Sequence, residues 1–162
     1  MIATSCSFCF YLINFYVKYL PGDIYTNQIV NSVAESASNG VAIVLVAVIG
    51  VKRGFVSSFV SCLIACIVVM YAEAYEHTWI IPFGVLGAKS GITIAFCFLY
   101  FSPSRYFEQC YLGLVMGASN TIGRASTIAA PIVAEMRNPI PMVSCILLCL
   151  AALVCATILE KP

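Results

Sequence analysis

Six long apolar stretches, separated by short connections, constrain this chain more than any other feature of its sequence. An α-helix needs about 20 mostly apolar residues to cross a bilayer. The six stretches reach or approach that length, and they cover residues 2–20, 24–51, 55–72, 79–101, 112–135 and 139–159. The sequence therefore predicts an all-α membrane protein in which residues 1–162 form a single domain, a bundle of six transmembrane helices.

The composition leads to the same class of protein. Hydrophobic residues make up 62% of the chain and charged residues 9%, whereas a soluble domain has about 25% charged residues. So few charges cannot cover a water-soluble surface, and we expect an integral, multi-pass protein whose main partner is the lipid bilayer. The net charge of +1 gives no reason to expect a nucleic-acid partner.

The distribution of basic residues predicts the orientation in the membrane. Alternate connections lie on opposite sides of a bundle of this kind. One side carries more basic residues than the other, namely Lys52, Arg53, Arg105 and the terminal Lys161. The other side has Lys18 and Arg137. Because cytoplasmic loops carry the excess of lysine and arginine, we expect the Lys52/Arg53 loop and the C-terminus in the cytoplasm, with the plasma membrane as the host.

Three ionisable residues, Glu35, Lys89 and Arg124, lie well inside the apolar stretches, away from their ends. A charge at the bilayer centre costs at least about 2.5–3.5 kcal/mol, so such residues usually face a partner or a cavity. Each has polar neighbours at helical spacing. These neighbours are Gln28, Asn31 and Asn39 in the second stretch, Thr93, Cys97 and Tyr100 in the fourth, and Gly117, Asn120 and Thr127 in the fifth.

Two interpretations of these polar faces stay open. Glu35 and Lys89 can pair and simply lock two helices together. Alternatively, the polar faces line a solute pathway, which three faces favour over a single ion pair. In the second case the first, second, fourth and fifth stretches line the inside, while the uncharged third and sixth stretches face lipid.

Four short motifs follow one another along the chain with consistent spacing. They are the aromatic pair Phe10–Tyr11, Gly22-Asp23-Ile24-Tyr25 with Asn27 and Glu35, Ala88-Lys89-Ser90-Gly91-Ile92 with Ala95-Phe96 and Tyr100, and Met116-Gly117 with Arg124 and Ala130-Pro131. Together they resemble the second half of the organic cation, organic anion and carnitine transporters in the major facilitator superfamily. The resemblance covers nearly the whole chain.

This resemblance implies that the six stretches correspond to helices seven to twelve of a twelve-helix major facilitator fold. It implies transport of a small organic ion (anion, zwitterion or cation) by alternating access, with the missing N-terminal half or a partner subunit supplying the rest. The candidate substrate-binding residues are Arg124, Glu35, Lys89, Tyr11, Phe10, Asn120 and Tyr100. A basic residue at Arg124 is typical of family branches that handle anions or zwitterions, and a guanidinium pairs well with a carboxylate.

The chain also departs from the family pattern. The loop after helix eight normally carries an acid and several basic residues, but Ala47 to Lys52 lacks most of them. The loop before helix eleven is similarly changed between Arg105 and Leu112, and a family proline is Ala37 here. These losses favour an alternative function, namely a degenerate, non-transporting structural subunit of a larger membrane assembly.

Other chemistry finds little support in the sequence. Six of the nine cysteines form close pairs, which are Cys6 with Cys9, Cys62 with Cys66, and Cys145 with Cys149. No histidine or acid accompanies them, so we interpret them as small apolar residues and expect no metal site. We find no glycine-rich phosphate loop and expect no cofactor. The only aspartate is Asp23 and the only histidine is His77, so we expect no enzymatic activity.

Overall fold

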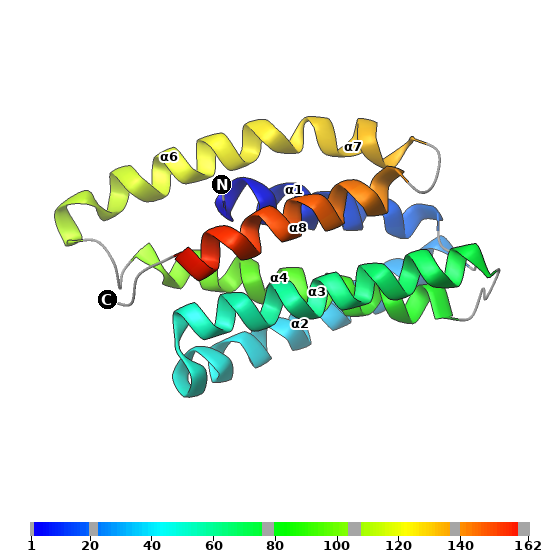
Figure 1. Ribbon diagram of the computed structural model, residues 1–162, viewed down its shortest axis with the longest axis horizontal. Helices are drawn as coiled ribbons and strands as arrows, with labels where there is room; N and C mark the ends of the chain where they lie inside the picture. Colours follow the sequence, from blue (N-terminus) through cyan, green and yellow to red (C-terminus); the bar gives the residue numbers. More distant parts are fainter. Residues whose placement is uncertain (1, 20–22, 76–79, 104–107, 137–139, 159–162) are drawn as a thin grey trace.

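The computed structural model describes residues 2–19, 23–75, 80–103, 108–136 and 140–158 (Figure 1). Its elements are α1 (Ile2–Tyr16), the 3-10 turn η1 (Val17–Tyr19), α2 (Ile24–Ile49), α3 (Val51–Ala74), α4 (Ile80–Phe101), α6 (Gln109–Thr127), α7 (Ala129–Ala134) and α8 (Ile140–Ile158). No strand occurs among these residues, which confirms the predicted all-α class. Gly22, His77, Trp79, Arg105, Arg137 and Lys161 lie outside the described residues.

Four of the described helices are long and apolar enough to cross a membrane, namely α2, α3, α4 and α8. They match the second, third, fourth and sixth predicted spans, which supports an integral membrane protein. The helices at the first and fifth predicted spans are not among these four. Helix α1 has 15 residues, fewer than the about 20 that a bilayer requires. Helix α6 has 19 residues but holds a polar run around Arg124.

The boundary between the second and third spans differs from the prediction. Residues 52–54 were expected to form a connection, but they belong to α3 and only Gly50 separates the two helices. Gly50 has φ 81° and ψ 168°, a backbone region that is essentially restricted to glycine. A single residue can therefore reverse the chain, so α3 begins at Val51 instead of Phe55.

The predicted fifth span is divided into α6 and α7. Pro131 has no backbone N–H to donate to the carbonyl of Thr127, and its ring clashes with that carbonyl in a continuous helix. Helix α6 accordingly ends at Thr127, and α7 resumes at Ala129. Helix α6 also begins at Gln109, three residues before the predicted Leu112.

The helices pack in two layers. Contacts of α2 with α4, of α4 with α1, and of α1 with α6 define one layer, while α3 and α8 contact each other and pack on α4 and α1. In Figure 1, α6 and α2 lie at opposite edges of the bundle. Helices α3 and α8, which match the third and sixth predicted spans, thus share the second layer. Most of their outward side chains are apolar, for example Ile64, Ile67, Leu147 and Val154. Arg53, Ser57 and Ser61 on α3 are also exposed.

Glycines bring α3 and α4 into close contact. A Cβ added at Gly91 would lie 2.9 Å from the backbone nitrogen of Cys62, and one at Gly84 would lie 2.6 Å from Cγ2 of Val69. Small residues at helix interfaces are the usual means of close packing inside membranes. The rings of Phe55 and Phe98, whose centroids are 5.7 Å apart, fill the space beside this contact.

Candidate functional site

The candidate site is centred on Lys89, whose side chain is fully buried on α4. Its Nζ lies 3.1 Å from Oε2 of Glu35 on α2 and donates a hydrogen bond of 2.7 Å to Oδ1 of Asn14 on α1. The same Nζ lies 3.5 Å from the ring centroid of Phe10. The predicted Glu35–Lys89 pair is therefore present, and it joins three helices.

This arrangement accounts for a charge in the middle of an apolar helix. An ammonium group has three N–H donors, and the carboxylate, the amide oxygen and the face of the Phe10 ring surround it. Glu35 is 33% exposed, so the pair has a buried cationic end and a carboxylate that reaches the protein surface. A solute or ion that approaches this surface would meet Glu35 before Lys89.

Two buried polar atoms beside the pair have no hydrogen-bond partner among the described residues. They are Oδ1 of Asn31 and Oγ1 of Thr93. Asn31 lies one turn before Glu35 on α2, donates 3.1 Å to Oδ1 of Asn14, and leaves its own carbonyl oxygen unpaired. Thr93 lies one turn after Lys89 on α4. An unsatisfied buried polar group costs about 1–3 kcal/mol. A solute or water that formed a hydrogen bond to one of these atoms would therefore be stabilised at this position.

The polar face of α4 continues beyond the pair. The Cys97 thiol donates to Oδ1 of Asn39 on α2 over 2.9 Å, and the Tyr100 hydroxyl donates to Oδ1 of Asn120 on α6 over 3.2 Å. In the layer order α1 separates α4 from α6, so Tyr100 reaches past α1. Single contacts from the predicted polar face of α4 thus reach α2 and α6.

Aromatic rings form a chain from α1 to α4 next to the pair. Phe10 meets Tyr11 edge-on at 5.5 Å and stacks on Phe96 at 5.2 Å between ring centroids. Phe96 in turn contacts Tyr100 at 5.2 Å. Tyr11 and Tyr100 are both exposed. The predicted aromatic residues therefore form one continuous row of rings, and exposed tyrosines, Tyr11 and Tyr100, stand at its two ends.

Arg124 stands apart from this network. It is exposed in the last turn of α6, and its side chain has no hydrogen bond or ion pair within the described part of the chain. The preceding Gly123 is buried against α1, where an added Cβ would lie 2.7 Å from Oγ of Ser7. The structure therefore fixes the position of α6 but leaves the guanidinium available.

Asn14 holds the network together, although no sequence pattern pointed to it. Its Oδ1 accepts from both Lys89 and Asn31. Asn14 lies three and four residues after Tyr11 and Phe10, so helical spacing could have placed it on the same face. Asn14 is a single amide in an otherwise apolar stretch, so the sequence alone did not indicate that it binds two other side chains.

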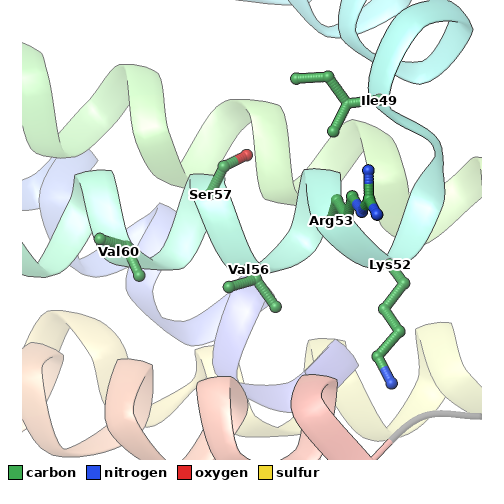
Figure 2. A pocket seen from close by; sticks show the side chains of 6 residues that line it. All are labelled: Ile49, Lys52, Arg53, Val56, Ser57 and Val60. Carbon is green, nitrogen blue, oxygen red and sulfur yellow. The ribbon is translucent and has the colours of Figure 1, made fainter.

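Two of the surface concavities among the described residues lie away from this site. The larger, about 510 Å³, is at the α2–α3 turn and is lined by Ile49, Lys52, Arg53, Val56, Ser57 and Val60. Figure 2 shows the side chains of Lys52 and Arg53 pointing away from each other there. The smaller, about 150 Å³, is lined by Tyr16, Tyr19, Ala134, Glu135 and Met136. Neither includes a predicted substrate-binding residue.

Comparison with known proteins adds no family assignment. No protein-family model matches the chain, and no curated protein matches it either. The chain is a helical protein with four candidate membrane spans and a buried ion pair at the junction of three helices.

Proposed function

We propose that this chain forms one half of a secondary transporter for a small organic ion, built like the C-terminal half of a major facilitator. The observation that carries the proposal is the Lys89–Glu35–Asn14 network. Ionisable residues inside membrane spans are costly and usually serve ion or substrate pathways. Here the network also includes two unpaired polar atoms on Asn31 and Thr93, which a simple lock between helices does not require.

Each residue has a distinct proposed role. Arg124, which is exposed and unpaired in the described structure, binds a carboxylate of the substrate through its two-pronged guanidinium. Phe10, Tyr11 and Tyr100 form the apolar wall against the substrate body. The Glu35–Lys89 pair sets the charge of the cavity, and it opens or closes as the two halves of the transporter rock against each other.

A second candidate function is a structural subunit without transport activity. Lys52 and Arg53 favour it because, in the described parts of the chain, neither forms an ion pair across the α2–α3 turn. Charge pairs at this loop latch the helices of the transporters that the sequence resembles. A chain that lost them would keep the bundle and lose the ability to change conformation.

Uptake into proteoliposomes separates the two functions. The protein, purified with whatever second half accompanies it in its native membrane, is tested with organic anions, zwitterions and cations. We expect saturable uptake of a carboxylate-bearing substrate. Arg124→Ala should weaken apparent affinity about 10- to 100-fold, because charge-assisted hydrogen bonds contribute about 1.5–3 kcal/mol. Lys18→Ala, at an exposed cation outside the proposed site, is the matched control and should leave uptake unchanged.

Two results would contradict the proposed transport function or the role of Arg124. If no substrate of any charge class is taken up, the subunit function is favoured. If uptake occurs but Arg124→Ala and Lys18→Ala behave alike, transport stands and the role of Arg124 is wrong.

A further inference from the structure

Five cysteines from three helices meet in the core, although the sequence separates them widely. They are Cys9 on α1, Cys62 and Cys66 on α3, and Cys145 and Cys149 on α8, and all are fully buried. The Sγ atoms of Cys62 and Cys149 are 3.7 Å apart, as are those of Cys66 and Cys145, and the Sγ atoms of Cys149 and Cys9 are 3.9 Å apart. We refer to these five residues as the thiol cluster.

The thiol cluster contains two overlapping sets of three sulphur atoms. In one set Cys9, Cys145 and Cys149 lie within 4.8 Å of one another, and in the other Cys62, Cys66 and Cys145 do. Sulphur ligands about 2.3 Å from a tetrahedral metal are about 3.8 Å apart. Thiols that merely pack together show similar separations. The inference of a metal site therefore rests on the number of thiols that converge and less on any single distance.

Sulphur-only surroundings select a soft cation. Thiolate ligands favour Cu⁺, Zn²⁺ and iron–sulphur clusters over harder ions. No carboxylate, imidazole or basic side chain belongs to either set, and the neighbours of the cluster are apolar. Uncompensated charge is expensive in such surroundings, so the favoured occupant leaves the site nearly neutral.

Charge distinguishes the two commonest candidates. Zn²⁺ held by four thiolates leaves two negative charges in the core with no counter-ion. One Cu⁺ bound at each set needs only one thiolate per ion for neutrality. The remaining thiols then stay protonated as neutral sulphur ligands, and Cys145, which belongs to both sets, can bridge them.

We propose that the thiol cluster is a buried Cu⁺-binding site formed by α1, α3 and α8. Each Cu⁺ replaces the proton of one thiol, forms a copper–sulphur bond and releases H⁺, so neither copper nor sulphur changes oxidation state. Because all five thiols are inaccessible in the closed bundle, copper enters as the helices assemble. The site is separate from the Lys89 network and does not depend on transport.

The test uses the full chain made in copper-supplemented cells and purified anaerobically in detergent. Metal analysis should find copper in preference to zinc, at up to one ion per set. X-ray absorption should show sulphur as the only ligand element. A copper(I) chelator, bathocuproine disulphonate, should remove the metal only when the bundle is opened by denaturant.

Alanine variants then locate the copper. Cys145→Ala removes the shared ligand and should lose the most metal. Cys9→Ala and Cys66→Ala each damage one set, so each should lose about half. The matched control is Cys97→Ala with Cys155→Ala, which lie outside the cluster and should keep the wild-type content. Helix content and gel-filtration volume confirm folding, and if Cys145→Ala misfolds, the two single-set variants decide.

Three results would overturn the proposal. A wild-type chain without bound metal means that the thiols serve only as packing. Zinc in place of copper means that the charge argument is wrong. Copper that persists in all three cluster variants but disappears in the control variants places the metal outside the core.

Discussion

At the scale of single residues, Lys89 shows how an apolar bundle accommodates a charge. Its ammonium contacts a carboxylate from α2, an amide from α1 and an aromatic ring from α1. The exposure of the two charges differs, because Lys89 is fully buried and Glu35 is 33% exposed. Removal of one partner should therefore have a different effect from removal of the other.

We predict that Glu35→Leu destabilises the protein more than Lys89→Met. Glu35→Leu leaves a buried ammonium without its counter-ion, and breaking a buried pair in this way costs about 3–5 kcal/mol. Lys89→Met leaves a carboxylate that can still reach solvent or headgroups. The measurement is the midpoint of thermal unfolding in detergent for each variant and for the double variant.

The double variant supplies the control for this prediction. It contains no unpaired charge, so it should be more stable than Glu35→Leu alone. If the effects of the two substitutions simply add, the residues are not coupled, and the ion pair contributes nothing to the fold.

The ion pair was predictable from the sequence, whereas the thiol cluster was not. In a chain with so few charges, Glu35 and Lys89 have hardly any other partners inside the membrane. The cysteine pairs, in contrast, contain two ligands each and lack histidine, so each pair taken alone indicates packing. Only the approach of α1, α3 and α8 brings three or more sulphur atoms together.

At the scale of helices, the α3–α4 contact depends on the absence of side chains at a few positions. Gly91 faces the backbone of α3 at Cys62 and Ser58. A backbone cannot move aside as a flexible side chain can. Gly40 on α2, in contrast, has no heavy atom within 4 Å of its added Cβ.

We predict that Gly91→Ala destabilises the bundle, whereas Gly40→Ala is neutral or stabilising. Overpacking of a tight interface costs about 1–3 kcal/mol, whereas alanine in an uncrowded helix gains up to about 1 kcal/mol over glycine. Thermal unfolding of the two variants under identical conditions gives the comparison. Equal midpoints would mean that α3 and α4 are not packed as closely as the structure describes.

Helix boundaries were less predictable than the helices themselves. The charges of Lys52 and Arg53 suggested a loop, but both residues lie in the first turn of α3, because one glycine is enough for the turn. Within the fifth predicted span, Pro131 breaks the helix. Apolar length identifies a membrane span, whereas the exact ends depend on local backbone geometry.

At the scale of the whole molecule, the bundle has two distinct ends. The α2–α3 turn, the start of α6 and the end of α8 lie at the same end in Figure 1. The α2–α3 turn contains Lys52 and Arg53 and belongs to the predicted cytoplasmic side. The exposed Cys110 in α6 therefore serves as a natural reporter for the orientation.

We predict that a membrane-impermeant maleimide labels Cys110 only after the membrane is permeabilised. The positive-inside rule places this end in the cytoplasm, where the reagent cannot reach it in intact cells. Cys110→Ala is the control, because it should remove the label that appears after permeabilisation. Labelling of the native chain in intact cells would mean that the orientation is inverted.

The two faces of the bundle differ in the partner that they can accept. Most outer side chains of α3 and α8 are apolar and suit lipid, as Leu147 illustrates. Helix α2 has only Asn31, Ser38 and Ala42 buried, and it exposes polar residues such as Gln28 and Asn39. Amides exposed to hydrocarbon would be left without hydrogen bonds. In a membrane, the polar side of α2 therefore requires protein or water beside it.

We predict that a photoreactive amino acid at Gln28 forms an adduct with protein, whereas the same probe at Leu147 forms adducts with lipid. If this sequence belongs to a longer polypeptide, an immunoblot of native membranes shows a band far above 17.5 kDa, and the Gln28 adduct is internal. If the second half is a separate subunit, the band stays near 17.5 kDa and shifts upward on irradiation. Lipid adducts at both positions would mean that no second half covers α2, and a rocking mechanism between two halves would then be impossible.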